Sequence, residues 1–344
     1  MKRSIKFLAA AAVLMFVVPA HAAWVDLSGN FQAAGLGSQT GLITDPTTDT
    51  LYALRGNAIR RYDAGTDSWT ALTPSTFGGY SGGDNYTPMF YAGGKFLLRG
   101  HLENYAESYD IVSDSWSQSP LPTAPSGNYS HSQGATFDTN SGRLQTLWTV
   151  FPAGGGEIMA TSTYDHLAGT WSAVSEYTWP SPFAHWGGVQ SVSVGTTNYI
   201  YDDRDATPSL KTYDFTTGPF PEGVAGRTAA GNFNSGGGTQ TFGQQYMAAV
   251  GTDIYVTGGD QSGDFAVYHT LTDTWENLDP YANAPGGFRD HSTAIAGGII
   301  YTTDFDQFFA NQVAAVIPEP STFVLLVLAV AGLMGQRLVR RQRS

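Results

Sequence analysis

The sequence predicts an all-β protein built from repeated sheets, and two observations support this prediction. Charged residues make up only 13% of the 344 residues, whereas aromatic residues also make up 13% and glycines number 41. This composition favours strands joined by tight turns over exposed helices. In addition, a tyrosine precedes a large aromatic residue by seven positions in five similar segments. Such internal similarity indicates structural units that pack side by side.

The five similar segments lie roughly 50 residues apart, as expected of four-stranded units. They are "RRYDAGTDSWTAL" (60–72), "ESYDIVSDSWSQS" (107–119), "STYDHLAGTWSAV" (162–174), "KTYDFTTGPFPEG" (211–223) and "AVYHTLTDTWENL" (266–278). The aromatic pairs in them are Tyr62/Trp69, Tyr109/Trp116, Tyr164/Trp171, Tyr213/Phe220 and Tyr268/Trp275. Each of these side chains can bury ~150–250 Å² against a neighbouring sheet, so we expect them to form the core rather than a cofactor site.

The first 22 residues have the features of a secretory signal peptide. Lys2, Arg3 and Lys6 precede an apolar run, and Ala20-His21-Ala22 has the small-x-small form of a cleavage site. We expect removal of 1–22 and export of the chain that follows.

The two ends of the repeat region predict how the sheets close into a ring. Strands in "STAIAGGIIYTTD" (292–304) and "QFFANQVAAV" (307–316) leave the last unit without an outer strand. The segment "WVDLSG" (24–29) is similar to "WTALTP" (69–74) and "WENLDP" (275–280), which close earlier units. We therefore expect Trp24 to Ser28 to supply the missing strand, which would hide the sheet edges. The sequence predicts a six-bladed β-propeller, with seven blades as the alternative.

Two segments resemble a known repeat family. In "GTDIYVTGGDQSGDFAVYHTLTDTWENL" (251–278) a glycine doublet precedes Tyr268 and Trp275, and "RDHSTAIAGGIIYTTD" (289–304) opens with Arg, His and Ser. This order resembles kelch repeats, in which each repeat forms one propeller blade. Earlier copies lack the doublet, and the fourth has Phe220 in place of tryptophan, so the resemblance is to a divergent kelch-like propeller.

The end of the chain combines a proline motif, an apolar run and a basic cluster. Pro318-Glu319-Pro320 leads into the 18 residues Thr322–Val339, which as a helix would extend roughly 27 Å, close to the ~30 Å hydrocarbon thickness of a bilayer. Arg337, Arg340 and Arg341 mark the cytoplasmic end by the positive-inside rule. We expect a C-terminal transmembrane helix here.

Residues 317–344 resemble the PEP-CTERM tail of Gram-negative bacteria, which in that family is recognised and processed by an exosortase in the inner membrane. The resemblance implies export across that membrane, transient anchoring through the helix, and delivery to the cell surface or the extracellular matrix. The chain then has three parts: a signal peptide (1–22), a kelch-like propeller (23–316) and the sorting segment (317–344).

Charge and cysteine content exclude several kinds of function. Of the charged residues, 28 acids but only ten Lys and Arg lie in 23–316, so this body carries a net charge of about −18. Nucleic acid is therefore not an expected partner. The chain has no cysteine, which excludes thiolate metal sites, cysteine nucleophiles and a galactose-oxidase-like Tyr-Cys cofactor.

Two sets of side chains are candidate metal ligands. His131, His185 and His291 occupy one repeat position at the start of the innermost strand, where they could bind a metal or serve as structural hydrogen-bond partners. The acidic segments 201–206, 258–264 and 303–307 could bind calcium, although turn chemistry accounts for aspartate at these places equally well. We expect no cofactor, with calcium as the alternative.

The segments between sheets are the candidate binding regions. Those at 75–88, 119–130 and 225–245 are rich in Gly, Tyr, Asn and Ser, which suits sugar rings and hydroxyls. The expected function is therefore a binding or scaffold module for exopolysaccharide or a surface protein. The alternative is a secreted carbohydrate-active enzyme. Against it, Asp63, Asp110 and Asp165 precede their tryptophans by six residues, whereas a sialidase Asp box requires five.

Overall fold

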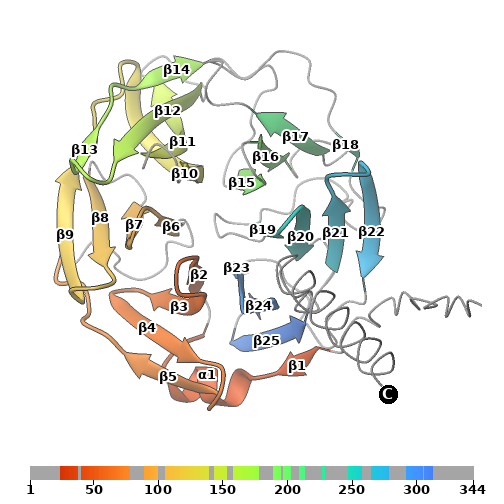
Figure 1. Cartoon of the computed structure of the whole chain (residues 1–344). Coiled ribbons are helices and arrows are strands. Elements are labelled where there is room, and N and C mark those ends of the chain that lie inside the picture. Colours follow the sequence, from red (N-terminus) through yellow and green to blue (C-terminus); the bar gives the residue numbers. More distant parts are fainter. Residues whose placement is uncertain are drawn as a thin grey trace, which may run out of the picture.

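We describe a computed structural model of the chain, whose strands form six antiparallel sheets arranged around a ring (Figure 1). The described residues are 24–37, 40–77, 89–99, 105–138, 143–152, 158–177, 189–194, 197–202, 209–213, 227–228, 247–257, 265–278, 292–304 and 306–312. The predicted signal peptide (1–22) and the predicted transmembrane helix (322–339) lie outside them. Within these ranges, no helix is both long enough and apolar enough to cross a membrane.

Five of the sheets are made of consecutive strands. Sheet one contains β2 (Gly41–Asp45), β3 (Thr50–Arg55), β4 (Ala58–Asp63) and β5 (Ser68–Ala71); sheet two contains β6 (Met89–Tyr91), β7 (Lys95–Arg99), β8 (Tyr105–Asp110) and β9 (Ser115–Pro120). Sheet three contains β10 (Gly127–Asp138), β11 (Arg143–Pro152), β12 (Ile158–Asp165), β13 (Thr170–Trp171) and β14 (Ser175–Tyr177). Sheet four contains β15 (Val189–Val194), β16 (Thr197–Asp202), β17 (Ser209–Tyr213) and β18 (Arg227–Thr228); sheet five contains β19 (Met247–Val250), β20 (Asp253–Thr257), β21 (Phe265–His269) and β22 (Thr274–Leu278).

The sixth sheet, here called the closing sheet, joins the two ends of the folded chain. It contains β23 (Ser292–Ala296), β24 (Ile299–Asp304) and β25 (Gln307–Gln312), with β1 (Val25–Asp26) as its outer strand. Val25 pairs with Ala310 and Asp26 with Phe309. The prediction that the N-terminal segment supplies the outer strand is confirmed. Trp24 contacts sheet five, where its ring lies 5.0 Å from that of Phe265.

The innermost strands complete the ring. β2, β6, β10, β15, β19 and β23 each contact the next along the chain, and β23 also contacts β2. Because these contacts form a closed cycle, no further sheet lies between the described inner strands. The all-β propeller prediction is therefore confirmed, and its sheets leave only short, protected edges.

A short helix that the sequence did not predict reinforces the closure. α1 (Ser28–Ala33) begins within the segment expected to be strand. Phe31 is fully buried and stacks on Phe308 of β25 at 5.1 Å, while its edge meets Trp69 of sheet one at 5.9 Å. The helix therefore links the closing sheet to sheet one, since one aromatic side chain packs against both.

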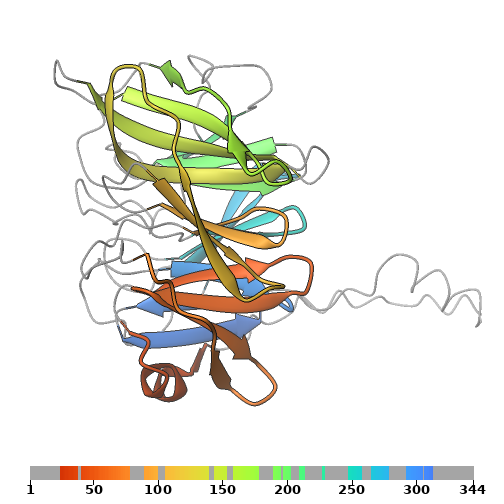
Figure 2. The same ribbon diagram turned by 90° about the vertical axis from the view of Figure 1, so that its left-hand side faces the viewer.

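The ring has two unlike faces (Figure 2). On the turn face, short hairpins join the first strand of a sheet to the second and the third to the fourth, as at 46–49, 64–67 and 297–298. On the opposite face, here called the loop face, the chain passes from the second strand to the third and from one sheet to the next. The segments 75–88, 119–130 and 225–245 all make this last kind of connection.

Candidate functional site

The repeated aromatic pairs lie opposite each other in the two outer strands of their sheets. Tyr62 pairs with Trp69, Tyr109 with Trp116, Tyr164 with Trp171 and Tyr268 with Trp275, and ring centroids in the four pairs are 4.7–5.2 Å apart. Each tyrosine is buried against the preceding sheet, as Tyr109 is against Tyr52 and Ile43 of sheet one. Tyr213 ends β17, and Phe220 lies outside the described residues. The described pairs therefore form the contacts between sheets.

The tyrosine hydroxyls are held by aspartates in the following turn. Tyr62, Tyr109 and Tyr268 donate hydrogen bonds of 2.6–2.8 Å to Asp67, Asp114 and Asp273. These three aspartates have positive φ angles of 47–57°, and Gly169 takes the same place after Tyr164. Burial, followed by the hydrogen bond to aspartate, raises the pKa of the Tyr62 and Tyr109 hydroxyls far above the ordinary value. These phenols stay protonated donors, which suits a structural role.

The aspartate that directly follows the tyrosine caps the same turn. Oδ1 of Asp63 accepts the amide hydrogen of Gly65, and Oδ1 of Asp165 accepts those of Leu167 and Ala168, all at 2.9–3.0 Å. Asp110 accepts the amide of Ser113 at 2.9 Å, and this hydrogen bond holds the pKa of Asp110 below its ordinary value. These three carboxylates each accept amide hydrogens of their own turn, in three different sheets, so turn capping accounts for them.

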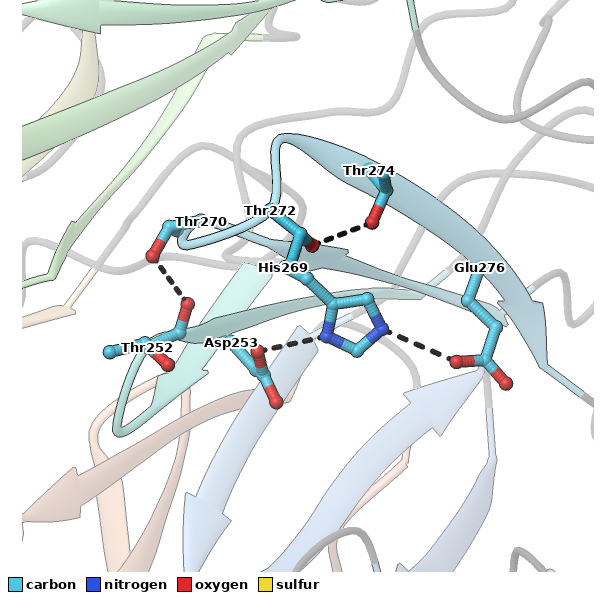
Figure 3. A network of polar contacts seen from close by, with 7 residues as sticks. All are labelled: Thr252, Asp253, His269, Thr270, Thr272, Thr274 and Glu276. Atoms are coloured by element: carbon cyan, nitrogen blue, oxygen red, sulfur yellow. Dashed lines mark hydrogen bonds and ion pairs between the residues drawn. The ribbon is translucent and has the colours of Figure 1, made fainter. Parts of the chain in front are cut away.

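Sheet five departs from this pattern because His269 takes the place of the capping aspartate. Its Nδ1 lies 2.9 Å from Oδ1 of Asp253, and its Nε2 lies 3.3 Å from Oε2 of Glu276 (Figure 3). The imidazole is thus flanked by carboxylates from both neighbouring strands on the turn face. The sequence did not predict this cluster, although histidine in the aspartate position of "AVYHTLTDTW" was a visible signal.

The cluster is partly exposed and titratable. About a third of the His269 and Asp253 side chains is exposed, and about half of Glu276. Burial lowers the pKa of His269, but the hydrogen bonds to Asp253 and Glu276 outweigh it and raise the pKa above its ordinary value. The arrangement favours an imidazolium that donates to both carboxylates. In the described part of the chain, no group of three or more histidine, aspartate or glutamate side chains is placed to hold a metal ion.

The predicted metal candidates lie mostly outside the described residues. His131 lies on β10, whereas His185 and His291 are outside the described ranges, as is the acidic segment 258–264. The segments 201–206 and 303–307 are described only in part. The histidine-metal and calcium hypotheses therefore stay predictions.

A buried hydroxyl network lies at the loop-face ends of two adjoining sheets. Thr257 of β20 hydrogen-bonds to Thr293 of β23, and Thr293 lies 3.2 Å from Thr302 of β24. Beside them, the amide of Ser292 donates to the Thr303 hydroxyl at 3.0 Å, and all five residues are at most 1% exposed. Since Thr257 and Ser292 directly adjoin the segments 258–264 and 279–291, the network fixes where these connections start and end.

A second buried contact fixes the start of the connection between sheets one and two. The Ser75 hydroxyl donates to Oε2 of Glu107 at 2.8 Å, and Glu107, on β8, is fully buried. The 75–88 segment is thereby joined at its first residue to the core of sheet two. A buried carboxylate that accepts a hydrogen bond is costly to replace, so this attachment is specific.

The seam between the closing sheet and sheet one contains a cavity of about 520 Å³ on the turn face. Its lining includes Asp49, Asp63, Tyr62, Gly297 and Tyr301. Both tyrosines are more than 90% buried, so they offer no aromatic surface for a sugar ring to stack on. This cavity is thus a poor match to the expected carbohydrate ligand.

Comparison with known proteins identifies a sorting motif in the C-terminal segment. A search of curated proteins finds no match to the chain. Residues 316–343 match the family model described as the PEP-CTERM protein-sorting motif, and they include Pro318, Glu319, Pro320, Arg337, Arg340 and Arg341. This motif is recognised by exosortase and implies export and surface sorting. The chain is thus a β-propeller that carries a PEP-CTERM sorting motif at its C-terminus.

Proposed function

We propose that this protein is a binding or scaffold module of divergent kelch type, displayed at the cell surface or in the extracellular matrix. Its loop face contacts exopolysaccharide or a surface protein. One observation carries the proposal: three segments that each contain Gly, Asn, Ser and aromatic residues all connect sheets at the same face of a closed ring. Recognition by propellers and similar scaffolds is concentrated in such connections.

The contrast between the two faces supports the choice of the loop face. On the turn face, Asp63, Asp110 and Asp165 are bonded to their own turns, and Asp67 and Asp114 accept tyrosine hydroxyls. These polar groups are already used for structure. On the loop face, buried contacts at Ser75 and Thr257 hold the bases of the connections, which is the arrangement that a recognition surface needs.

The proposed route to the surface follows from the sorting motif. The signal peptide exports the chain, the helix at 322–339 holds it transiently in the inner membrane with Arg337, Arg340 and Arg341 on the cytoplasmic side, and exosortase processes the tail. Substitution of Pro318 and Pro320 by alanine should leave the protein in the membrane fraction. Appearance of that variant at the surface at the normal level would contradict this route.

Retention in the matrix tests the binding proposal. Tyr80 and Tyr86, both in the segment 75–88, are replaced by alanine, and the fraction of exported protein that sediments with extracellular polysaccharide is measured. We expect a drop of roughly tenfold, in line with the loss of two aromatic contacts of about 0.7 kcal/mol each. Thr66→Ala on the turn face is the matched control and should be retained normally.

The partner class is decided by the same fractionation. Enzymatic removal of the polysaccharide should release the protein if the glycan is the ligand. Retention after that treatment would favour a surface protein. Shortening of the purified polysaccharide by the protein would favour the alternative, a secreted carbohydrate-active enzyme, and would contradict a pure binding role.

A further inference from the structure

We propose that, while the chain is anchored, its turn face lies against the membrane and touches the lipid surface through Val112, Leu167 and Leu271. This inference rests on the proposed transient anchor. It assigns an orientation, with the turn face toward the bilayer and the loop face toward the exterior. The position of the chain ends, the length of the tether and the exposed apolar side chains support this orientation.

Both ends of the folded body lie at the turn face. Ile299 follows the 297–298 turn and pairs with Gln312, the last residue of β25, so the chain leaves the ring beside that turn. Val25 pairs with Ala310, which places the start of the body near the same edge. The sorting motif that begins at residue 316 is therefore attached to the turn face.

The tether between the ring and the predicted membrane helix is short. Residues 313–321 separate Gln312 from Thr322, and nine residues span at most about 30 Å when fully extended. A body of 294 residues has a radius of gyration of about 19 Å. Since the longest possible tether is shorter than the diameter of the body, the face that carries the tether stays closest to the bilayer.

Three apolar side chains project from the turn face at one repeat position. Val112, Leu167 and Leu271 each stand three residues after the repeat tyrosine, in the hairpin between the third and fourth strands. They are 93%, 83% and 81% exposed, more than any other large apolar side chain in the described ranges. Single exposed leucines are ordinary, but three equivalent ones on the tethered face form a set that a lipid interface can accommodate.

The negative charge of the body determines which lipid headgroups it can contact. Asp110 and Asp165 stand two residues before the apolar tips Val112 and Leu167, and the whole body is strongly acidic. Anionic headgroups would therefore repel this face, and zwitterionic headgroups fit it better. Three side chains alone give weak contact, so the tether must supply the effective concentration. The contact is then lost when the tail is cut, which frees the body to leave the membrane.

The absence of cysteine from the sequence makes a direct test possible. Single variants Val112→Cys, Leu167→Cys and Leu271→Cys carry an environment-sensitive fluorophore, and Asn57→Cys on the loop face is the matched exposed control. The full-length chain is reconstituted in vesicles of phosphatidylcholine and phosphatidylethanolamine that contain spin-labelled lipid as a quencher. We expect at least threefold stronger quenching at the three tips than at residue 57.

Flotation separates failure of this inference from failure of the anchor. The full chain should float with the vesicles, and a chain that ends before Pro318 should not. If the full chain does not float, the anchor proposal and the orientation both fall. If it floats but the label at residue 57 is quenched as strongly as the tip labels, the anchor stands and the orientation is wrong.

Discussion

The outer hairpins of sheets two and five share one framework but carry different titratable groups at one position. Both place a tyrosine opposite a tryptophan, and both bond the tyrosine hydroxyl to an aspartate of positive φ five residues later. Sheet two then has Asp110 as the turn cap, whereas sheet five has His269 between two carboxylates. The comparison teaches that the aromatic pair and the aspartate define the repeat, while the capping position accepts different chemistry.

Removal of the shared tryptophan should have the largest effect. Trp116→Ala in sheet two should lower the free energy of unfolding by roughly 2–3 kcal/mol, because it removes the packing of this half-buried ring on Tyr109 and the 2.7 Å bond from the indole to the Thr73 carbonyl. Trp275→Ala in sheet five should cost a similar amount. Urea unfolding measures both, and a transition midpoint unchanged by either substitution would count against their role in packing.

Substitution of the aspartate with positive φ should have the next largest effect on stability. Asp114 accepts the Tyr109 hydroxyl at 2.6 Å and both the amide and hydroxyl of Thr73 at 2.9 Å, so Asp114→Ala should cost about 2 kcal/mol. Asp114→Gly should be about 1 kcal/mol less harmful than alanine, because glycine tolerates the φ of 49° and already stands at Gly169 in sheet three. Equal losses for the two variants would show that the backbone angle is unimportant here.

Substitution of the turn-capping aspartate should have a smaller effect on stability. Asp110→Ala removes the acceptor for the Ser113 amide and should cost about 1 kcal/mol, whereas Asp110→Asn keeps an acceptor and should cost less. The lowered pKa of Asp110 means that its contribution is present above the unfolded pKa of ~3.9 and is lost as the pH falls through the lower folded value. Acid titration of stability, compared with the alanine variant, measures this loss.

Much of this framework could be predicted from the sequence, for a physical reason. Residues seven apart, such as Tyr109 and Trp116, face each other across a tight hairpin, so their spacing reports the register directly. The similarity of Trp24 and its neighbours to strands that close other sheets likewise predicted where β1 pairs.

Other features gave weaker or no sequence signals. α1 was missed because six residues with one buried aromatic, Phe31, carry no helical period. The role of Asp67, Asp114 and Asp273 depends on a positive φ that composition does not reveal, although their fixed place after tyrosine was available as a clue. His269 gave only a weak signal, because its carboxylate partners become adjacent only through strand pairing with β20 and β22.

The smallest predicted effect sharpens the comparison, because the two hairpins should respond to pH in opposite directions. The folded pKa of His269 is raised, so its contribution is fully present below the unfolded pKa of ~6.5 and is lost as the pH rises through the folded value. Because the cluster is about one-third exposed, its worth is a few tenths of a kcal/mol to 1 kcal/mol. Stability of the parent chain should therefore decline between about pH 6 and pH 8 relative to His269→Gln, which removes the titrating group. Glu276→Gln should remove only part of this decline in stability, since Asp253 still faces the imidazole at 2.9 Å.

The opposite outcome is that the stabilities of the parent chain and of the His269→Gln variant run parallel across this pH range. The imidazole would then add no net interaction, and the histidine would be only a tolerated replacement of the aspartate.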